Sequence, residues 1–466
     1  MSPETMLELA NKTAELIVER IKKLPEEHAW DGEFKKELED QLMEEPPEQG
    51  SSATEVLERA AKEILPLGAR NDHPRFFAFM PSSPTWPGVL ADFMVSAHQV
   101  NQCTWLTSSG ASQMELVVID WFRRWLEYPE TAGGLMTSGG SAASLEALVA
   151  AREAAGNPYN ATVYMSDQSH SALVRAARII GIPDENARLI QTDARYRLDP
   201  EALKHAIEQD RSAGYKPVAV CANAGASSTG AIDPLETMAD LCEAEGIWFH
   251  VDAAYGGFAV ITERGKPLLR GIGRADSIGL DAHKLFFQPY EAGCLMVKDL
   301  GTLERAFAVR HDILQDTVWG ANHPNFSDRG LQLSRSVRAL KIWMSVQTFG
   351  IAAFRRAVSK GLELAAQAED YIRNSNTLEM LLPGSLGIVC FRVNPGHANL
   401  DESILDAINK KVLVRIFWED RAFISSTNLR EKFSLRLCIV NYTTSWDDVL
   451  ETLDAIERFG NEALPD

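Results

Sequence analysis

Five short apolar runs, separated by stretches with helical spacing, lie between about Gly133 and Asp299 and restrict the fold more than any other feature. They read ATVYM, KPVAVCANA, GIWFHVDAA, DSIGLDA and AGCLMVK. Runs that are apolar on both faces and alternate with helices are typical of a parallel sheet covered by helices on both sides. Such sheets bind ligands where strands end and loops begin. We therefore expect the chemistry at these strand ends.

Helical segments flank this α/β region and predict three parts of the chain. Helices are expected within residues 1–66 and, after about residue 310, over 333–357 and 360–374. Two strand-like runs, LGIVCFRV and KFSLRLCIVNY, and a final amphipathic helix follow. We predict an N-terminal helical arm (1–85), a large domain (86–350) and a small α+β C-terminal domain (351–466).

The N-terminal arm has little core of its own. Its first helix spaces apolar residues along one face, namely Met6, Ala10, Ala14, Ile17 and Ile21. A lone helical pair buries too little surface to persist. The arm should therefore pack on the main body or on a second subunit, and we favour dimerisation.

Charge and cysteine usage exclude several classes of protein. The 466 residues include 46 Lys and Arg and 65 Asp and Glu, which gives a net charge of −19. This negative charge disfavours nucleic acid and anionic membranes as partners. No apolar stretch reaches the roughly 20 residues that span a bilayer. The six cysteines form no CxxC pair. We expect reduced thiols, a cytoplasmic location and no metal site.

Lys284 and Asp252 are the strongest candidates for chemistry. Lys284 follows the run DSIGLDA with only His283 between them. Desolvation there would lower the pKa of its ammonium and free a nucleophilic amine, although most lysines after strands are simply solvated. Asp252 ends another strand, where a carboxylate needs a cation or a donor, or else caps the AAYGG turn. An aspartate against a pyridinium and an imine-forming lysine are the two requirements for pyridoxal phosphate.

Two further segments could hold the rest of such a cofactor. In TSGGSAASLEALVAAR, Gly139, Gly140 and Ser141 precede a helix whose free amides and positive dipole end suit a phosphate. The segment has neither GK[ST] nor GxGxxG, and a plain turn is the alternative. His170, in SDQSHSALV, begins a helix after the strand ATVYM. It is either a surface residue or a ring that stacks on a flat cofactor.

The motifs TSGGS, SDQSH, HVDAAYGG and DAHK, in this order, resemble the group II pyridoxal-phosphate decarboxylases, specifically those of the aromatic-L-amino-acid decarboxylase type. The resemblance covers nearly the whole chain. It implies the type I fold of pyridoxal-phosphate enzymes, with a mainly parallel seven-stranded sheet, and a homodimer with shared active sites. The resemblance implies that Lys284 forms the imine with the cofactor. It also implies a set of further cofactor-binding residues, namely His283, Asp252, Ala254, His170, Gly140, Ser141 and Ser227.

The same resemblance implies a substrate pocket. Its candidates are Phe79, Pro81, Ser82, Trp105, His323, Phe326 and Arg436. The implied reaction is decarboxylation of an aromatic L-amino acid. Phe326 falls where many relatives carry a loop tyrosine that protonates the product, so an oxygen-dependent aldehyde synthase is the alternative, with His323 as another proton donor. The alternative that is not an enzyme is a protein that binds the cofactor without turnover.

Overall fold

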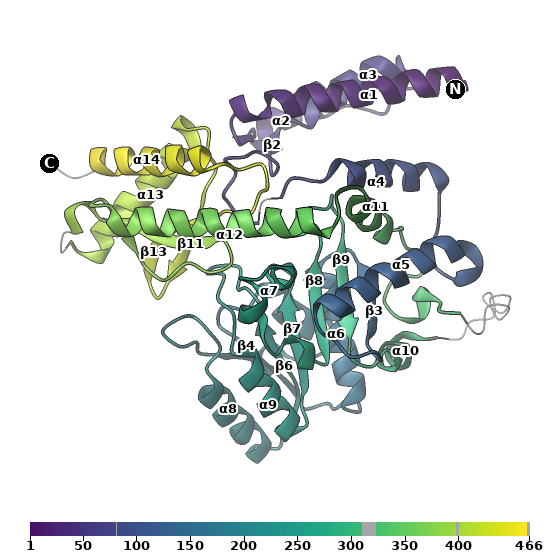
Figure 1. Ribbon diagram of the computed structural model, residues 1–466, viewed down its shortest axis with the longest axis vertical. Coiled ribbons are helices and arrows are strands. Elements are labelled where there is room, and N and C mark those ends of the chain that lie inside the picture. Colours follow the sequence, from purple (N-terminus) through teal and green to yellow (C-terminus); the bar gives the residue numbers. More distant parts are fainter. Residues whose placement is uncertain (81, 310–322, 398–399, 464–466) are drawn as a thin grey trace. The chain divides into compact units, whose positions relative to one another are not determined.

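The computed structural model describes residues 1–80, 82–309, 323–397 and 400–463. The chain divides into two compact units. Figure 1 shows the chain coloured by residue number from the N-terminus to the C-terminus. The first comprises Met1–Pro81, Gln367–Leu381 and Cys390–Asp466, and the second comprises Ser82–Ala366 and Leu382–Val389. Each unit is described by itself below.

The second unit is built on a seven-stranded sheet with the order β3-β9-β8-β7-β6-β4-β5. The five neighbouring strands β5, β4, β6, β7 and β8 are parallel to one another. β9 is antiparallel to both of its neighbours, β8 and β3. The mainly parallel seven-stranded sheet expected from the resemblance is thus confirmed. The strands are β3 (Gly133–Thr137), β4 (Ala161–Ser166), β5 (Ala187–Ile190), β6 (Lys216–Asn223), β7 (Trp248–Ala253), β8 (Ser277–Asp281) and β9 (Gly293–Val297).

Helices cover this sheet, as the apolar strands require. α6 packs along β6 to β9, while α8 and α9 contact β6. Every residue of β3, β4, β8 and β9 is buried, so both sheet faces are covered. The helices of this unit are α4 (Trp86–His98), α5 (Trp105–Trp125), α6 (Gly140–Ala154), α7 (Ser171–Ile179), α8 (Pro200–Ser212), α9 (Leu235–Glu245), α10 (Gly301–Phe307) and α11 (Ala339–Phe349).

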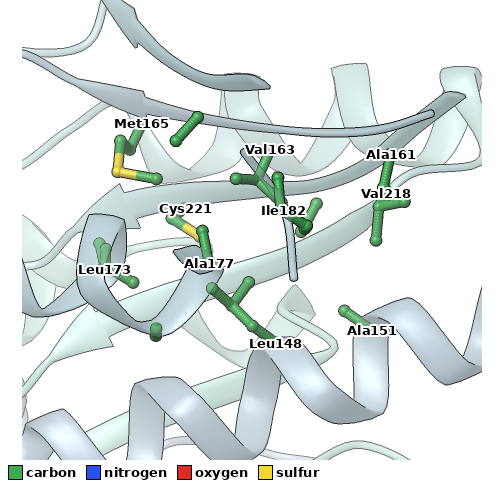
Figure 2. Packing of buried hydrophobic residues seen from close by; sticks show 13 residues of the cluster. Leu148, Ala151, Ala161, Val163, Met165, Leu173, Ala177, Ile182, Val218 and Cys221 are labelled. Atoms are coloured by element: carbon green, nitrogen blue, oxygen red, sulfur yellow. The ribbon is translucent and has the colours of Figure 1, made fainter. Parts of the chain in front are cut away.

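Figure 2 shows how part of this core is packed. Leu148 of α6 and Leu173 of α7 lie against Val163 of β4 and Cys221 of β6, and all four are fully buried. Burying such a leucine or valine stabilises the fold by roughly 1.5–3 kcal/mol. This packing holds the first turns of α6 and α7 at the carboxyl ends of the strands.

The first unit contains the N-terminal helices and a small sheet. The helices are α1 (Pro3–Lys23), α2 (Lys35–Leu42), α3 (Ala53–Arg59), α13 (Glu402–Glu419) and α14 (Trp446–Glu462). The four-stranded sheet has the order β10-β11-β13-β12, formed by β10 (Leu378–Met380), β11 (Ile388–Val393), β12 (Ser425–Leu429) and β13 (Lys432–Cys438). A two-stranded ribbon pairs β1 (Trp30–Asp31) with β2 (Gly68–Ala69). α1 contains no buried residue.

The helices predicted over 333–357 and 360–374 have different bounds. α11 begins only at Ala339, because the backbone before it bonds elsewhere: the Arg335 N–H donates to Asn101 Oδ1 at 3.1 Å and the Arg335 carbonyl accepts from Gln102. The break falls at Gly350, whose φ of 71° suits glycine, and α12 (Ile351–Asn374) then runs on without interruption. Within the described ranges, no helix is both long and apolar enough to cross a membrane.

Candidate active site

Lys284 lies in the turn after β8 and forms an ion pair with Asp281, the last residue of that strand. Its Nζ is 2.9 Å from Asp281 Oδ2, and Asp281 is only 2% exposed. Burial disfavours the ammonium, but the carboxylates of Asp281 and Asp252 outweigh burial and raise the pKa of Lys284. The expected lowering of this pKa is therefore wrong for the protein without cofactor, because the sequence argument left out the nearby carboxylates.

Asp252 lies on β7, the strand next to β8. Its Oδ1 accepts the Ala254 N–H at 3.1 Å, so it caps the following turn as the simpler interpretation proposed. It also lines the same cavity as Lys284. One carboxylate can serve both purposes, because its second oxygen remains able to meet a ligand.

His283 is held as a neutral imidazole beside this ion pair. Its Nδ1 accepts the Ala292 N–H at 3.2 Å, and its Nε2 lies 3.5 Å from Asp281 Oδ2. Burial lowers the pKa of His283, although Asp281 opposes the shift. Its ring packs against Tyr290 with centroids 4.6 Å apart. With Nδ1 accepting, the ring proton is on Nε2 and faces Asp281.

The predicted phosphate cradle forms the start of α6. Gly139 is the N-cap and Gly140 the first helical residue. A Cβ on Gly140 would lie 2.8 Å from the Ala254 Cβ, so only glycine lets the helix start approach the turn after β7 this closely. The first turn of a helix presents unpaired N–H groups and a positive dipole end. The cradle can accept an anion.

One cavity of about 400 Å³ brings most of the predicted cofactor residues together. His170 is the N-cap of α7, and its Nδ1 accepts the Ala172 N–H at 3.1 Å. It is thus an exposed helix-capping residue that also lines the cavity. The other predicted residues lining the cavity are Gly139, Gly140, Ser141, Ser227, Asp252, Ala254, His283 and Lys284.

Three of the predicted substrate-pocket residues make contacts within the second unit. Ser82 donates from its hydroxyl to the Lys284 carbonyl at 3.0 Å, so it contacts the turn that holds the lysine. Trp105 and His323 stack with ring centroids 4.6 Å apart and an interplanar angle of 11°. These two residues are not among those lining the Lys284 cavity.

The other pocket residues have different surroundings. Phe326 is 0% exposed beneath the Arg335 guanidinium, which lies 4.8 Å from its ring centroid, and it does not line the cavity. In the first unit, Arg436 donates to the Phe79 carbonyl at 2.9 Å. Pro81 lies outside the described residues. Membership of Phe79, Pro81, Phe326 and Arg436 in a substrate pocket stays a prediction.

The sequence argument missed Asp281, Asn223 and Tyr290, which also line the cavity. Asp281 and Asn223 each end an apolar strand, so the rule that selected Asp252 would have found them. The Asn223 Nδ2 donates to Ser166 Oγ and to Asp233 Oδ2, each at 3.0 Å. The Asp281 Oδ1 atom is buried without a hydrogen-bond partner among the described residues.

The residues of the cavity fit pyridoxal phosphate. Lys284 provides an amine for the aldehyde, Asp252 a carboxylate for the pyridine nitrogen, and the α6 start a cradle that a side chain at Gly140 would fill. His170 and Ala254 provide a ring and a small apolar group for the two faces of a flat cofactor.

Comparison with known proteins agrees with this geometry. An aromatic-L-amino-acid decarboxylase from Bacillus atrophaeus is 38% identical over 99% of this chain and 97% of its own length. A phenylacetaldehyde synthase from Arabidopsis thaliana is 32% identical over 90% of this chain and 88% of its own. The crystal structure of Oryza sativa TDC with PLP and tryptamine superposes with a TM-score of 0.95 at 28% identity, covering 100% and 99% of the two chains.

Residues 35–394 match the pyridoxal-dependent decarboxylase conserved domain, which is more than half of the chain. The match includes every residue of the cavity that holds Lys284, Asp252 and the α6 start. The chain therefore belongs to the pyridoxal-dependent decarboxylase family.

Proposed function

We propose that the protein decarboxylates an aromatic L-amino acid to the corresponding arylalkylamine and CO₂ with pyridoxal phosphate as cofactor. The observation that carries this proposal is the single cavity containing Lys284, Asp252 and the glycine-lined start of α6. The aromatic substrate class is supported by relatives named as aromatic-L-amino-acid, tyrosine and tryptophan decarboxylases.

The roles of the residues follow from their positions. Gly140, Ser141 and the α6 dipole bind the phosphate, and Asp252 binds the protonated pyridine nitrogen. When bound, pyridoxal phosphate supplies an electron sink for the pair that CO₂ leaves behind. His170 and Ala254, which line the cavity, would contact the flat ring and orient it.

Asp281 prepares Lys284 for covalent attachment. The lysine is an ammonium in the ion pair, and only its deprotonated amine can attack an aldehyde. Asp281 Oδ2, at 2.9 Å, is placed to take that proton. The same oxygen could return a proton to the site, so Asp281 would act as the local proton acceptor and donor for Lys284. His283 Nε2 lies 3.5 Å from the same carboxylate oxygen.

The product is expected to be the amine. The alternative, oxygen-dependent aldehyde formation, is favoured by Phe326 and by phenylacetaldehyde synthases among the relatives. In this chain, however, Phe326 is fully buried beneath Arg335, so we assign it a packing role. His323, stacked on Trp105, remains a candidate proton donor to the product.

The decisive measurement is product analysis under air. The purified protein with pyridoxal phosphate and each aromatic amino acid should release CO₂ and amine in equal amounts, without hydrogen peroxide. Aldehyde with ammonia and peroxide in the wild type, reverting to amine in Phe326→Tyr, would establish the oxidative alternative. The absence of both amine and aldehyde, despite a visible cofactor band, would favour a scaffold without turnover.

We also propose that two copies form a homodimer with shared active sites, held in part by the N-terminal helices. α1 buries none of its residues, and its exposed apolar side chains include Leu7 (64% exposed) and Ile21 (46% exposed). A second copy would remove this apolar surface from water.

The dimer is testable by sedimentation. The wild type should sediment at twice the 51.5 kDa chain mass, and the double variant Leu7→Glu/Ile21→Glu should shift toward monomer at micromolar concentration. Tyr159→Glu, at an exposed position on the second unit, is the matched control and should remain dimeric. A monomeric wild type would refute the proposal.

We place the protein in the cytoplasm. All six cysteines are buried, and none of them forms a disulfide among the described residues, which suits a reducing compartment. Localisation of a tagged full-length chain tests this assignment, and recovery from an oxidising compartment would contradict it.

A further inference from the structure

One buried histidine of the HVDAAYGG segment has no role so far. His250, in the middle of β7, is 0% exposed, and its Nε2 atom has no hydrogen-bond partner among the described residues. An unpaired polar atom in a protein interior is costly, and each case needs a reason. Burial lowers the pKa of His250 to about 4, although Asp252 opposes the shift, so the imidazole is neutral.

The neighbours of His250 determine which of its nitrogens carries the proton. Ser277 Oγ accepts the indole N–H of Trp248 at 2.8 Å and lies 2.9 Å from His250 Nδ1. Ser277 is fully buried, and among the described residues its hydroxyl oxygen lies within hydrogen-bond distance only of Trp248 Nε1 and His250 Nδ1. The hydroxyl therefore donates to Nδ1, because any other arrangement leaves its hydrogen unpaired. The imidazole proton is then on Nε2.

The Nε2–H group faces the region beside Asp252. Side chains alternate along a strand, so His250 and Asp252 lie on the same face of β7. In the adjacent strand β8, Ser277 pairs with His250 and Gly279 pairs with Asp252. A Cβ on Gly279 would lie 4.0 Å from His250 Nε2 and 3.5 Å from the Ala143 Cβ. The absent side chain at Gly279 leaves a small space between the imidazole and Asp252.

We infer that His250 is a positioning residue that donates a hydrogen bond from Nε2 to the Asp252 carboxylate through one buried water in the space beside Gly279. It acts on the cofactor only through Asp252, by holding that carboxylate in the orientation that meets the pyridine nitrogen. This inference rests on the proposed function, because it assigns Asp252 to that nitrogen.

Two substitutions at position 250 test the roles of the two imidazole nitrogens, Nδ1 and Nε2, separately. His250→Asn keeps an amide beside Ser277 but does not reach the position of Nε2, whereas His250→Gln places an amide N–H near it. The dissociation constant of pyridoxal phosphate is measured by titrating cofactor-free protein, without turnover. We expect about tenfold weaker binding in His250→Asn, the effect of one hydrogen bond to a charged group, and a change within about threefold in His250→Gln.

Two controls distinguish this role from a general packing role. A cofactor analogue with carbon in place of the pyridine nitrogen should bind the wild type and both variants equally. In the Asp252→Asn background, His250→Asn should cause no further loss of pyridoxal phosphate affinity, because the coupling partner is gone. Equal losses for cofactor and analogue, or additive losses in the double variant, would overturn the inference.

A third variant leaves the imidazole in place. Ser277→Ala removes the group that fixes the proton on Nε2, and it should weaken pyridoxal phosphate about threefold while leaving the analogue unaffected. An equal effect on both ligands would again overturn the inference. Failure of the wild type to bind pyridoxal phosphate would refute the proposed function itself. Tight binding to the wild type that no variant changes would refute only the role of His250.

Discussion

Replacing Lys284 with alanine is expected to lower kcat by at least about a thousandfold, because no other lysine among the described residues lines the cavity to form the covalent bond to the cofactor. In the structure this lysine is the residue that Asp281 holds at 2.9 Å, and it lines the same cavity as the phosphate cradle. The measurement is turnover together with the position of the cofactor after borohydride reduction. In the wild type, mass mapping should find the cofactor on Lys284.

The matched control for this substitution is Lys298→Ala, which removes an exposed lysine just after β9. It should keep wild-type turnover and wild-type labelling. Attachment of the cofactor to a lysine other than Lys284 after reduction would show that the assignment is wrong. Retention of substantial turnover in Lys284→Ala would show the same.

Replacing Asp252 with asparagine is expected to lower kcat by about 10²–10³-fold, because a neutral amide no longer stabilises the positive charge on the pyridine nitrogen. Pyridoxal phosphate affinity should fall by about tenfold or more, as an interaction between opposite charges is lost. The turn after β7 should persist, because the asparagine side-chain oxygen can still accept the Ala254 N–H.

Steady-state kinetics and cofactor titration of Asp252→Asn, compared with Asp276→Asn, check this expectation. Asp276 also caps a strand, accepting the Phe249 N–H at 2.8 Å, but it does not line the cavity. Its variant should keep wild-type kcat, and its asparagine oxygen can still accept the Phe249 N–H. Wild-type kcat in Asp252→Asn would remove Asp252 from the chemistry.

Local sequence was sufficient for the strand-end residues. Lys284, Gly140 and His170 each follow a buried strand, and Asp252 lies near the end of one. Parallel strands bring such positions to one edge of a sheet. Their assembly in one cavity therefore follows from alternating apolar runs and short motifs, without knowledge of the strand order. Motif resemblance added the cofactor and the reaction class, which periodicity alone does not contain.

The strand order decided what these residues do to one another. In the sheet, β8 lies between β7, which precedes it in sequence, and β9, which follows it. This order places Gly279 beside Asp252 and leaves the space that His250 faces. The pKa of Lys284 likewise depends on the turn that brings Asp281 to 2.9 Å, which reverses the direction expected from burial alone.

The amino-acid sequence by itself thus determined the α/β class and the residues at the strand ends, because periodicity and motifs are local properties. The seven-stranded sheet came only from the resemblance of those motifs to a known family. Only the tertiary structure decided that Phe326 is buried beneath Arg335, that the helix break falls at Gly350, and that Asp281 pairs with Lys284. These features depend on which side chains contact one another, either across segments far apart in sequence or within one turn. Electrostatic and packing energies change steeply with the distances between the contacting atoms, which the sequence does not give.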